Sequence, residues 1–198
     1  SDGMSSELEK SVLRVLNAQG ITCGAAFVVA PGLAVTCAHV VRNAGALPGG
    51  EIRLAFVQDE MIWHAQVDAA TFNEALDAAF LHLENNFPCP PPLPLVPSAH
   101  CTGKTIRAVG FPITRKSSTW AVGKFLGTVE EQSGKILLQI DSKQLRAGFS
   151  GAPIWSEESN GVIGMQAEAL NPQRLDLPAD VAFALPVEEL VSIHPGIT

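Results

Sequence analysis

The chain contains the hexapeptide Gly148-Phe149-Ser150-Gly151-Ala152-Pro153, in which a serine stands between two glycines and a proline closes the stretch. A hydroxyl that attacks a carbonyl must stand on a tight turn, near backbone N–H groups that are directed at the developing oxyanion. Glycine at position 148 lets the backbone turn its amide inward, and glycine at position 151 keeps the turn tight. Ser150 is therefore a candidate nucleophile.

Two segments upstream supply the partners that such a nucleophile needs. The first is Val35-Thr36-Cys37-Ala38-His39-Val40-Val41, which we predict to be an apolar strand with the histidine at its edge. The second is Leu76-Asp77-Ala78-Ala79-Phe80-Leu81-His82-Leu83, in which a carboxylate opens an apolar strand. A base (His39), an orienting acid (Asp77) and a nucleophile then follow in one of the three chain orders known for the Ser-His-Asp triad. Asp68 also lies in an expected strand and is the alternative acid.

These segments and their order resemble the trypsin-like serine proteases, most closely the bacterial HtrA-like branch. The resemblance runs over residues 11–193 and includes further short blocks: Ala26-Phe27-Val28-Val29-Ala30-Pro31, Val109-Gly110-Phe111-Pro112, Val162-Ile163-Gly164 and Ala182-Phe183-Ala184-Leu185-Pro186. It implies a chymotrypsin-like fold, a serine endopeptidase that needs no cofactor, and protein or peptide substrates.

The resemblance also implies roles for individual residues around the nucleophile. The oxyanion hole would be formed by the backbone N–H groups of Gly148 and Ser150. The substrate pocket would have Gln144 near its base and Ala167, Ala169 and Ala182 along its walls. Because no carboxylate stands at the base, we expect a small or medium apolar side chain there rather than Lys or Arg.

Phe149 departs from the pattern of the digestive trypsin-like enzymes, which have an aspartate there that pairs with a newly freed N-terminus. Phenylalanine cannot form that ion pair, so activation by N-terminal insertion is not expected. The HtrA likeness implies that a partner domain, subunit or ligand orders the loop 142–149. The alternative is that the apolar side chain holds this loop permanently competent.

The chain has four cysteines: Cys23, Cys37, Cys89 and Cys101. Secreted relatives usually link the cysteine at the Cys23 position to one directly after the catalytic histidine, where this chain has Val40. The spacing resembles neither a disulfide framework nor a zinc site, so we expect free thiols in a reducing cytoplasm and assign no metal. A hydrolase that uses Cys37 or Cys23 as its nucleophile is a rival hypothesis.

Composition limits the class of protein and of partner. With 46% hydrophobic and 17% charged residues, the 198-residue chain can build a sizeable core. Its net charge of −7 and lack of basic runs argue against nucleic acid as a partner. We find no membrane-spanning apolar stretch and no secretory signal pattern, so we expect a cytoplasmic protein with no membrane partner.

The pattern of apolar alternation predicts an all-β fold of two six-stranded antiparallel barrels with a short C-terminal helix. Residues 1–198 would form a single protease domain: an N-terminal barrel over 10–85, a proline-rich linker over 86–98, a C-terminal barrel over 99–186 and a helix over 187–193. The expected strands are 12–17, 24–30, 34–36, 52–57, 62–71, 78–83, 105–109, 119–130, 136–140, 152–155, 161–167 and 181–185.

Two further interpretations concern the biological role. A catalytically inactive, peptide-binding module with the same fold is the alternative to an enzyme. Domains of this style also resemble proteases that are fused to, or encoded beside, NTPase sensors in bacterial conflict and antiphage systems. The resemblance therefore implies a regulatory NTPase-type partner and a role in antiviral defence.

Overall fold

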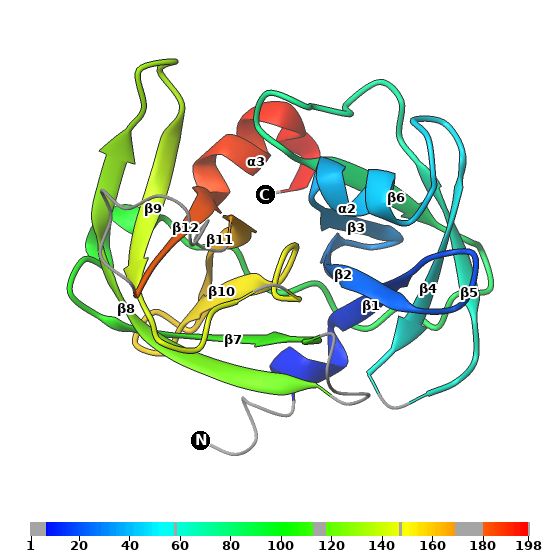
Figure 1. Cartoon of the computed structure of the whole chain (residues 1–198), viewed down its shortest axis with the longest axis horizontal. Helices are drawn as coiled ribbons and strands as arrows, with labels where there is room; N and C mark the ends of the chain where they lie inside the picture. Colours follow the sequence, from blue (N-terminus) through cyan, green and yellow to red (C-terminus); the bar gives the residue numbers. More distant parts are fainter. Residues whose placement is uncertain (1–6, 58, 113–117, 147, 169–179, 198) are drawn as a thin grey trace.

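The computed structural model describes residues 7–57, 59–112, 118–146, 148–168 and 180–197. Its strands form two closed antiparallel barrels that lie side by side (Figure 1). The two-barrel prediction is therefore confirmed. The first barrel has the order β1-β2-β3-β6-β5-β4 and is built from β1 (Val12–Leu16), β2 (Thr22–Ala30), β3 (Leu33–Thr36), β4 (Glu51–Phe56), β5 (Trp63–Val67) and β6 (Ala79–Leu83).

The second barrel repeats this arrangement with the order β10-β11-β12-β9-β8-β7. Its strands are β7 (Thr105–Gly110), β8 (Thr119–Glu130), β9 (Ile136–Asp141), β10 (Pro153–Ser156), β11 (Gly161–Glu168) and β12 (Val181–Pro186). Helix α3 (Val187–Ile193) follows β12, and short 3-10 turns lie at Ser98–His100 and Pro195–Ile197.

Alternating burial explains why these segments form barrel strands. In β4, Ile52 and Leu54 are buried while Glu51 and Arg53 are exposed, so apolar side chains fill the barrel and charged ones face solvent. β2 is different, because the residues from position 24 to position 29 are all buried. Its outer face packs against other parts of the protein instead of meeting water.

The segment predicted to be a strand ending at His39 divides into two elements, so that prediction was wrong. β3 ends at Thr36, Cys37 is extended, and helix α2 (Ala38–Asn43) begins at the next residue. The β-branched Val40 and Val41 favour a strand by local propensity. A bond from a distant residue supports the helix instead: the backbone N–H of His39, in its first turn, donates to the Asp77 carboxylate at 2.8 Å.

Two backbone amides of the proline-rich segment between the barrels bond to one barrel each. The N–H of Leu93 donates to the carbonyl of Val28 at 3.1 Å, and that of Val96 donates to the carbonyl of Val162 at 2.9 Å. The N–H of Val162 returns a bond to Pro94 at 2.8 Å. This segment thus connects β2 of the first barrel with β11 of the second.

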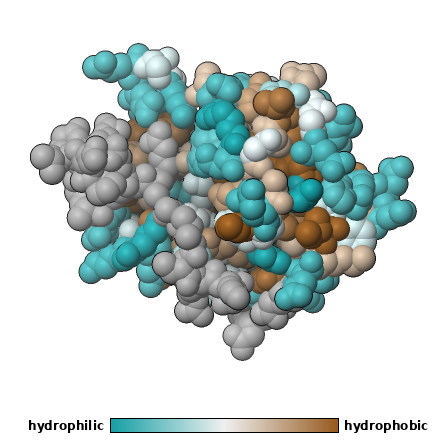
Figure 2. Space-filling model, turned by 45° about the vertical axis from the view of Figure 1, so that its right-hand side comes forward, coloured by the Kyte–Doolittle hydropathy of each residue, from teal (hydrophilic) through white to brown (hydrophobic). Residues whose placement is uncertain are grey.

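The surface mixes apolar and hydrophilic residues, as Figure 2 shows for one face. Among the residues that the structure describes, the large exposed apolar side chains are Ile21, Leu47, Met61, Ile62, Val122, Leu126 and Ile136. Within the described ranges, the helices are all too short or too polar to reach across a lipid bilayer.

Candidate active site

Asp77 stands on a tight turn directly before β6. The backbones of Asn73 and Ala78 exchange two hydrogen bonds of 2.9 Å, and the Asn73 side chain accepts the N–H of Leu76 at 2.8 Å. Asp77 itself has a φ of 58°, in the left-handed region that aspartate tolerates better than most residues. This turn sets the direction of the Asp77 carboxylate.

Both oxygens of the Asp77 carboxylate contact His39. Oδ2 lies 2.5 Å from the ring nitrogen Nδ1, and Oδ1 accepts the backbone N–H at 2.8 Å. The side chains are 31% exposed for His39 and 17% for Asp77, so water reaches the imidazole while the carboxylate is largely enclosed. A carboxylate bonded at Nδ1 leaves Nε2 as the nitrogen that can accept a proton.

Ser150 lies on the second barrel, but its backbone is bonded to the first. Its carbonyl accepts the N–H of Ala25 in β2 at 2.8 Å, and the carbonyl of Ala25 accepts the hydroxyl of Thr36 at 2.6 Å. Thr36 is the last residue of the strand that precedes His39. These bonds bring the serine turn against the segment that carries the histidine.

Gln166 in β11 provides a second connection between these segments. Its carbonyl accepts both the N–H of Gly151, at 2.8 Å, and the thiol of Cys37, at 3.2 Å. Gly151 follows Ser150, and Cys37 precedes His39 by two positions. Within the described ranges the half-buried Ser150 hydroxyl makes no hydrogen bond, and therefore none to His39.

The turn that carries Gly148 presents two free backbone donors. Gly148 has a φ of 98°, which glycine adopts more readily than other residues, and the N–H of Phe149 donates to the carbonyl of Arg146 at 3.2 Å. In the described part of the chain neither the Gly148 N–H nor the Ser150 N–H has an acceptor. Unpaired, adjacent N–H groups are what an oxyanion hole requires.

Cys37, His39 and Asp77 are the described residues that could together hold a metal ion, since one ligand atom of each lies within 4.8 Å of the others. Burial, and then the nearby Asp77 carboxylate, raises the pKa of the Cys37 thiol well above its usual value. An ion would have to remove the thiol proton and break the bond between Nδ1 and Oδ2. The arrangement therefore suits proton transfer better than metal binding.

All four cysteines are free thiols, with Cys37 and Cys101 buried and Cys89 exposed. Burial raises the pKa of Cys23 to about 11, so at neutral pH it too is protonated and unreactive. These environments argue against a cysteine nucleophile.

Excess iodoacetamide at about pH 7.5 is therefore expected to leave hydrolysis unchanged while it alkylates Cys89. Because Cys23 ionises only as the pH approaches about 11, its alkylation rate should rise about tenfold per pH unit below that value. Timed quenching and peptide mass spectrometry measure each thiol. Rapid inactivation at the lower pH, with alkylation at Cys23 or Cys37, would support a cysteine hydrolase instead.

The residues predicted for the substrate pocket have different surroundings. Gln144 is exposed, and its Oε1 accepts the backbone N–H of Val122 at 2.8 Å. Ala167 and Ala182 are buried, at 2% and 1% exposure. Ala169 lies outside the described residues.

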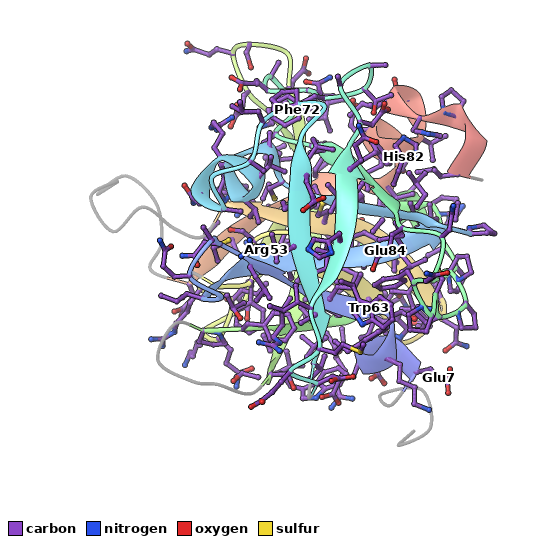
Figure 3. All side chains as sticks on the ribbon, turned by 90° about the vertical axis from the view of Figure 1, so that its right-hand side faces the viewer. Glu7, Arg53, Trp63, Phe72, His82 and Glu84 are labelled. Atoms are coloured by element: carbon purple, nitrogen blue, oxygen red, sulfur yellow. The ribbon has the colours of Figure 1, made fainter. Side chains whose placement is uncertain are left out.

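The alternative acid Asp68 follows β5, and two further histidines, His64 and His82, belong to β5 and β6. Figure 3 shows His82 on the outside of the first barrel. Asp68 accepts the Thr71 hydroxyl at 2.5 Å, which lowers the pKa of the carboxyl, and lies 3.6 Å from His82. His64 lies 3.6 Å from Glu51. Among the described residues Asp68 has no contact with His39, so Asp77 is the aspartate that meets the base.

Sequence reasoning missed two residues that help to position the candidate site. Asn73 has a recognisable signal, because asparagine side chains at turns often accept a nearby backbone N–H, here that of Leu76 three residues on. Gln166 has none, since its role depends on a carbonyl that meets Cys37 and Gly151 only in the folded protein.

Comparison with known proteins gives matches in sequence and in structure. Residues 24–165 match the family described as trypsin-like peptidase domain. The peroxisomal leader peptide-processing protease of Mus musculus is 30% identical over 154 residues, which cover 75% of this chain and 26% of that protein. The chain thus spans about a quarter of the length of this curated relative.

Solved structures share the fold. An inactive form of Rv3671c from M. tuberculosis superposes with a TM-score of 0.74 at 21% identity, covering 98% of this chain and 89% of that one. The active form of the same protease superposes with a TM-score of 0.72 at 21% identity, covering 98% of this chain and 83% of that one. The HtrA-type protease AlgW with a decapeptide superposes with a TM-score of 0.73 at 18% identity, covering 99% of this chain and 66% of that one.

Proposed function

The chain belongs to the trypsin-like peptidase domain family and is a serine endopeptidase, and we propose that it works through His39, Asp77 and Ser150. His39 Nε2 takes the hydroxyl proton while Ser150 Oγ bonds to the substrate carbonyl carbon. The same proton passes to the leaving amine as the C–N bond breaks. Water then hydrolyses the resulting acyl-enzyme, and His39 again acts as the base.

Asp77 and the Gly148 turn support these steps electrostatically. Asp77 keeps the proton of the neutral imidazole on Nδ1 and stabilises the imidazolium that forms. The N–H groups of Gly148 and Ser150 stabilise the negative charge on the carbonyl oxygen. The observation that carries the proposal is the double contact of one carboxylate with His39, at 2.5 Å to the ring and 2.8 Å to the backbone.

For the substrate we propose a protein or peptide with a small or medium apolar side chain at the cleaved bond. Ala167 and Ala182 support this, because both side chains are small and uncharged. AlgW has been solved with a decapeptide, which supports a peptide as ligand. Gln144 would stand near the pocket base, with its amide restrained by Val122.

We further propose that the enzyme acts in the cytoplasm as the effector of a bacterial conflict or antiphage system, under the control of an NTPase-type sensor domain or subunit. Its four free thiols suit a reducing compartment. Phe149 removes the ion pair on which N-terminal activation depends, so control by a partner is the simpler route. Mapping new peptide ends in a lysate, with and without the partner, tests this; cleavage that is equal in both would contradict it.

The experiment that tests the triad is labelling with a fluorophosphonate probe, which reacts with an activated serine. We expect a single labelled residue, Ser150, and no labelling of the Ser150→Ala variant. The Ser118→Ala variant is the control, because the Ser118 hydroxyl donates to the Glu9 carboxylate at 2.8 Å and has no role in the proposed chemistry. Absence of labelling in the wild-type protein, alone and with its partner, would favour the peptide-binding module.

A further inference from the structure

The block Gly110-Phe111-Pro112 has no role in the proposed chemistry, yet it lies directly against the serine turn. Gly110 ends β7, and a Cβ placed on it would lie 2.6 Å from Cδ1 and 2.8 Å from Cγ of Phe149. Real atoms do not approach so closely, so the Phe149 ring occupies the space that a side chain at position 110 would need. The ring is 1% exposed.

Hydrogen bonds fix the backbone on both sides of this ring. The carbonyl of Gly148 accepts the N–H of Phe111 at 3.0 Å, and the N–H of Phe149 donates to Arg146 at 3.2 Å, so the peptide that joins positions 148 and 149 is held at both ends. The carbonyl of Phe149 accepts the N–H of Ala152 at 2.9 Å.

These bonds set the directions of the two candidate oxyanion donors. In a trans peptide the N–H points opposite to the carbonyl, so holding the Phe149 carbonyl fixes where the Ser150 N–H points. Holding the peptide after Gly148, with that residue at a φ of 98°, fixes the Gly148 N–H in the same way. Phe149 is the residue that joins these two peptides, so a shift of its ring against Gly110 would disturb the bonds that set both donors.

We propose that Phe149, seated against Gly110, holds the oxyanion turn in its working shape, so that packing replaces the ion pair of a freed N-terminus. Phe149 and Gly110 are then positioning residues, which act through the backbone and do not touch the substrate. The inference rests on the proposed function, because it assigns the turn to oxyanion stabilisation. A regulatory partner would accordingly act on substrate access, since the turn is already ordered.

The first test is Gly110→Ala, whose methyl group displaces the ring. Losing the aligned donors should lower kcat by about 100-fold while KM changes by less than about threefold, because these donors act in the transition state. The control is Gly164→Ala in the same barrel, whose Cβ would meet Leu185 O at 2.6 Å and Leu138 Cδ1 at 2.7 Å without touching Phe149. It should lower Tm and leave kcat of the folded enzyme unchanged.

The second test uses compensation, which a loss of stability alone would not produce. Phe149→Leu should lower kcat by about tenfold, because a smaller side chain holds the turn less firmly. The double variant Gly110→Ala with Phe149→Leu should recover about tenfold over Gly110→Ala, because leucine leaves room for the new methyl group. The NMR signal of the proton between His39 Nδ1 and Asp77 should be the same in all of these variants.

The outcomes separate the two hypotheses. A wild-type kcat in folded Gly110→Ala would overturn the positioning role and leave the proposed function intact. The same holds if the loss of kcat in the double variant equals the product of the losses in the two single variants. Wild-type turnover that persists in Ser150→Ala would overturn the proposed function, and the positioning role with it. If Gly110→Ala does not fold, Phe149→Leu decides alone, through the split between kcat and KM.

Discussion

Ser150→Ala is expected to abolish hydrolysis, with kcat lower by about a millionfold, because the proposed acyl-enzyme forms on the hydroxyl that this substitution removes. Fluorescent casein or a peptide library gives the rate of the wild-type protein, and long incubations give the residual rate of the variant. The Ser150 hydroxyl makes no hydrogen bond to the described residues, so its removal should leave Tm within about 1 °C.

The unchanged Tm is the control, since it separates loss of chemistry from loss of fold. A variant that kept more than about a tenth of the wild-type kcat would assign the reaction to another nucleophile. In that case the thiols of Cys23 and Cys37 would have to be examined next, despite their raised pKa values.

Asp77→Asn is expected to lower kcat by about 10⁴-fold at neutral pH. The amide of asparagine would donate to His39 Nδ1, which forces the ring proton onto Nε2 and leaves no lone pair for the Ser150 proton. The backbone should tolerate the change, because asparagine also adopts a φ near 58° and its oxygen can still accept the His39 N–H. Steady-state kinetics with a fluorogenic peptide measure the loss.

Asp68→Asn is the matched control, because it removes a carboxylate that also lies near a histidine, at 3.6 Å from His82. Its kcat should equal that of the wild-type protein. If both variants lost the same factor in kcat, the negative charge of a surface carboxylate would explain the effect, and the orientation of the imidazole would not.

Much of the fold could be predicted from the sequence because barrel strands alternate in a simple way. Charged Glu51 and Arg53 face solvent while Ile52 and Leu54 are buried, and this period of two identifies β4 without any knowledge of its neighbours. Prediction failed at α2, where Val40 and Val41 favour a strand locally. The bond that supports the helix comes from Asp77, which lies 38 positions away from His39.

The candidate site shows the same division. His39, Asp77 and Ser150 could be proposed because each stands in a short local pattern. The two interpretations of Phe149 could not be separated, because the glycine that accommodates its ring lies on another strand. The hydrogen bond between the Gln144 amide and Val122 likewise could not be predicted, because the two residues meet only in the folded protein.

The hydrogen bond between Ala25 and Ser150 has a consequence for how this protein can change over evolutionary time. The serine is covalently part of one barrel but is held in place by the other, so neither half could be inherited alone with a working centre. Outer surfaces of each barrel are free to diverge toward new partners. The residues that join the two barrels at this bond have to be inherited together.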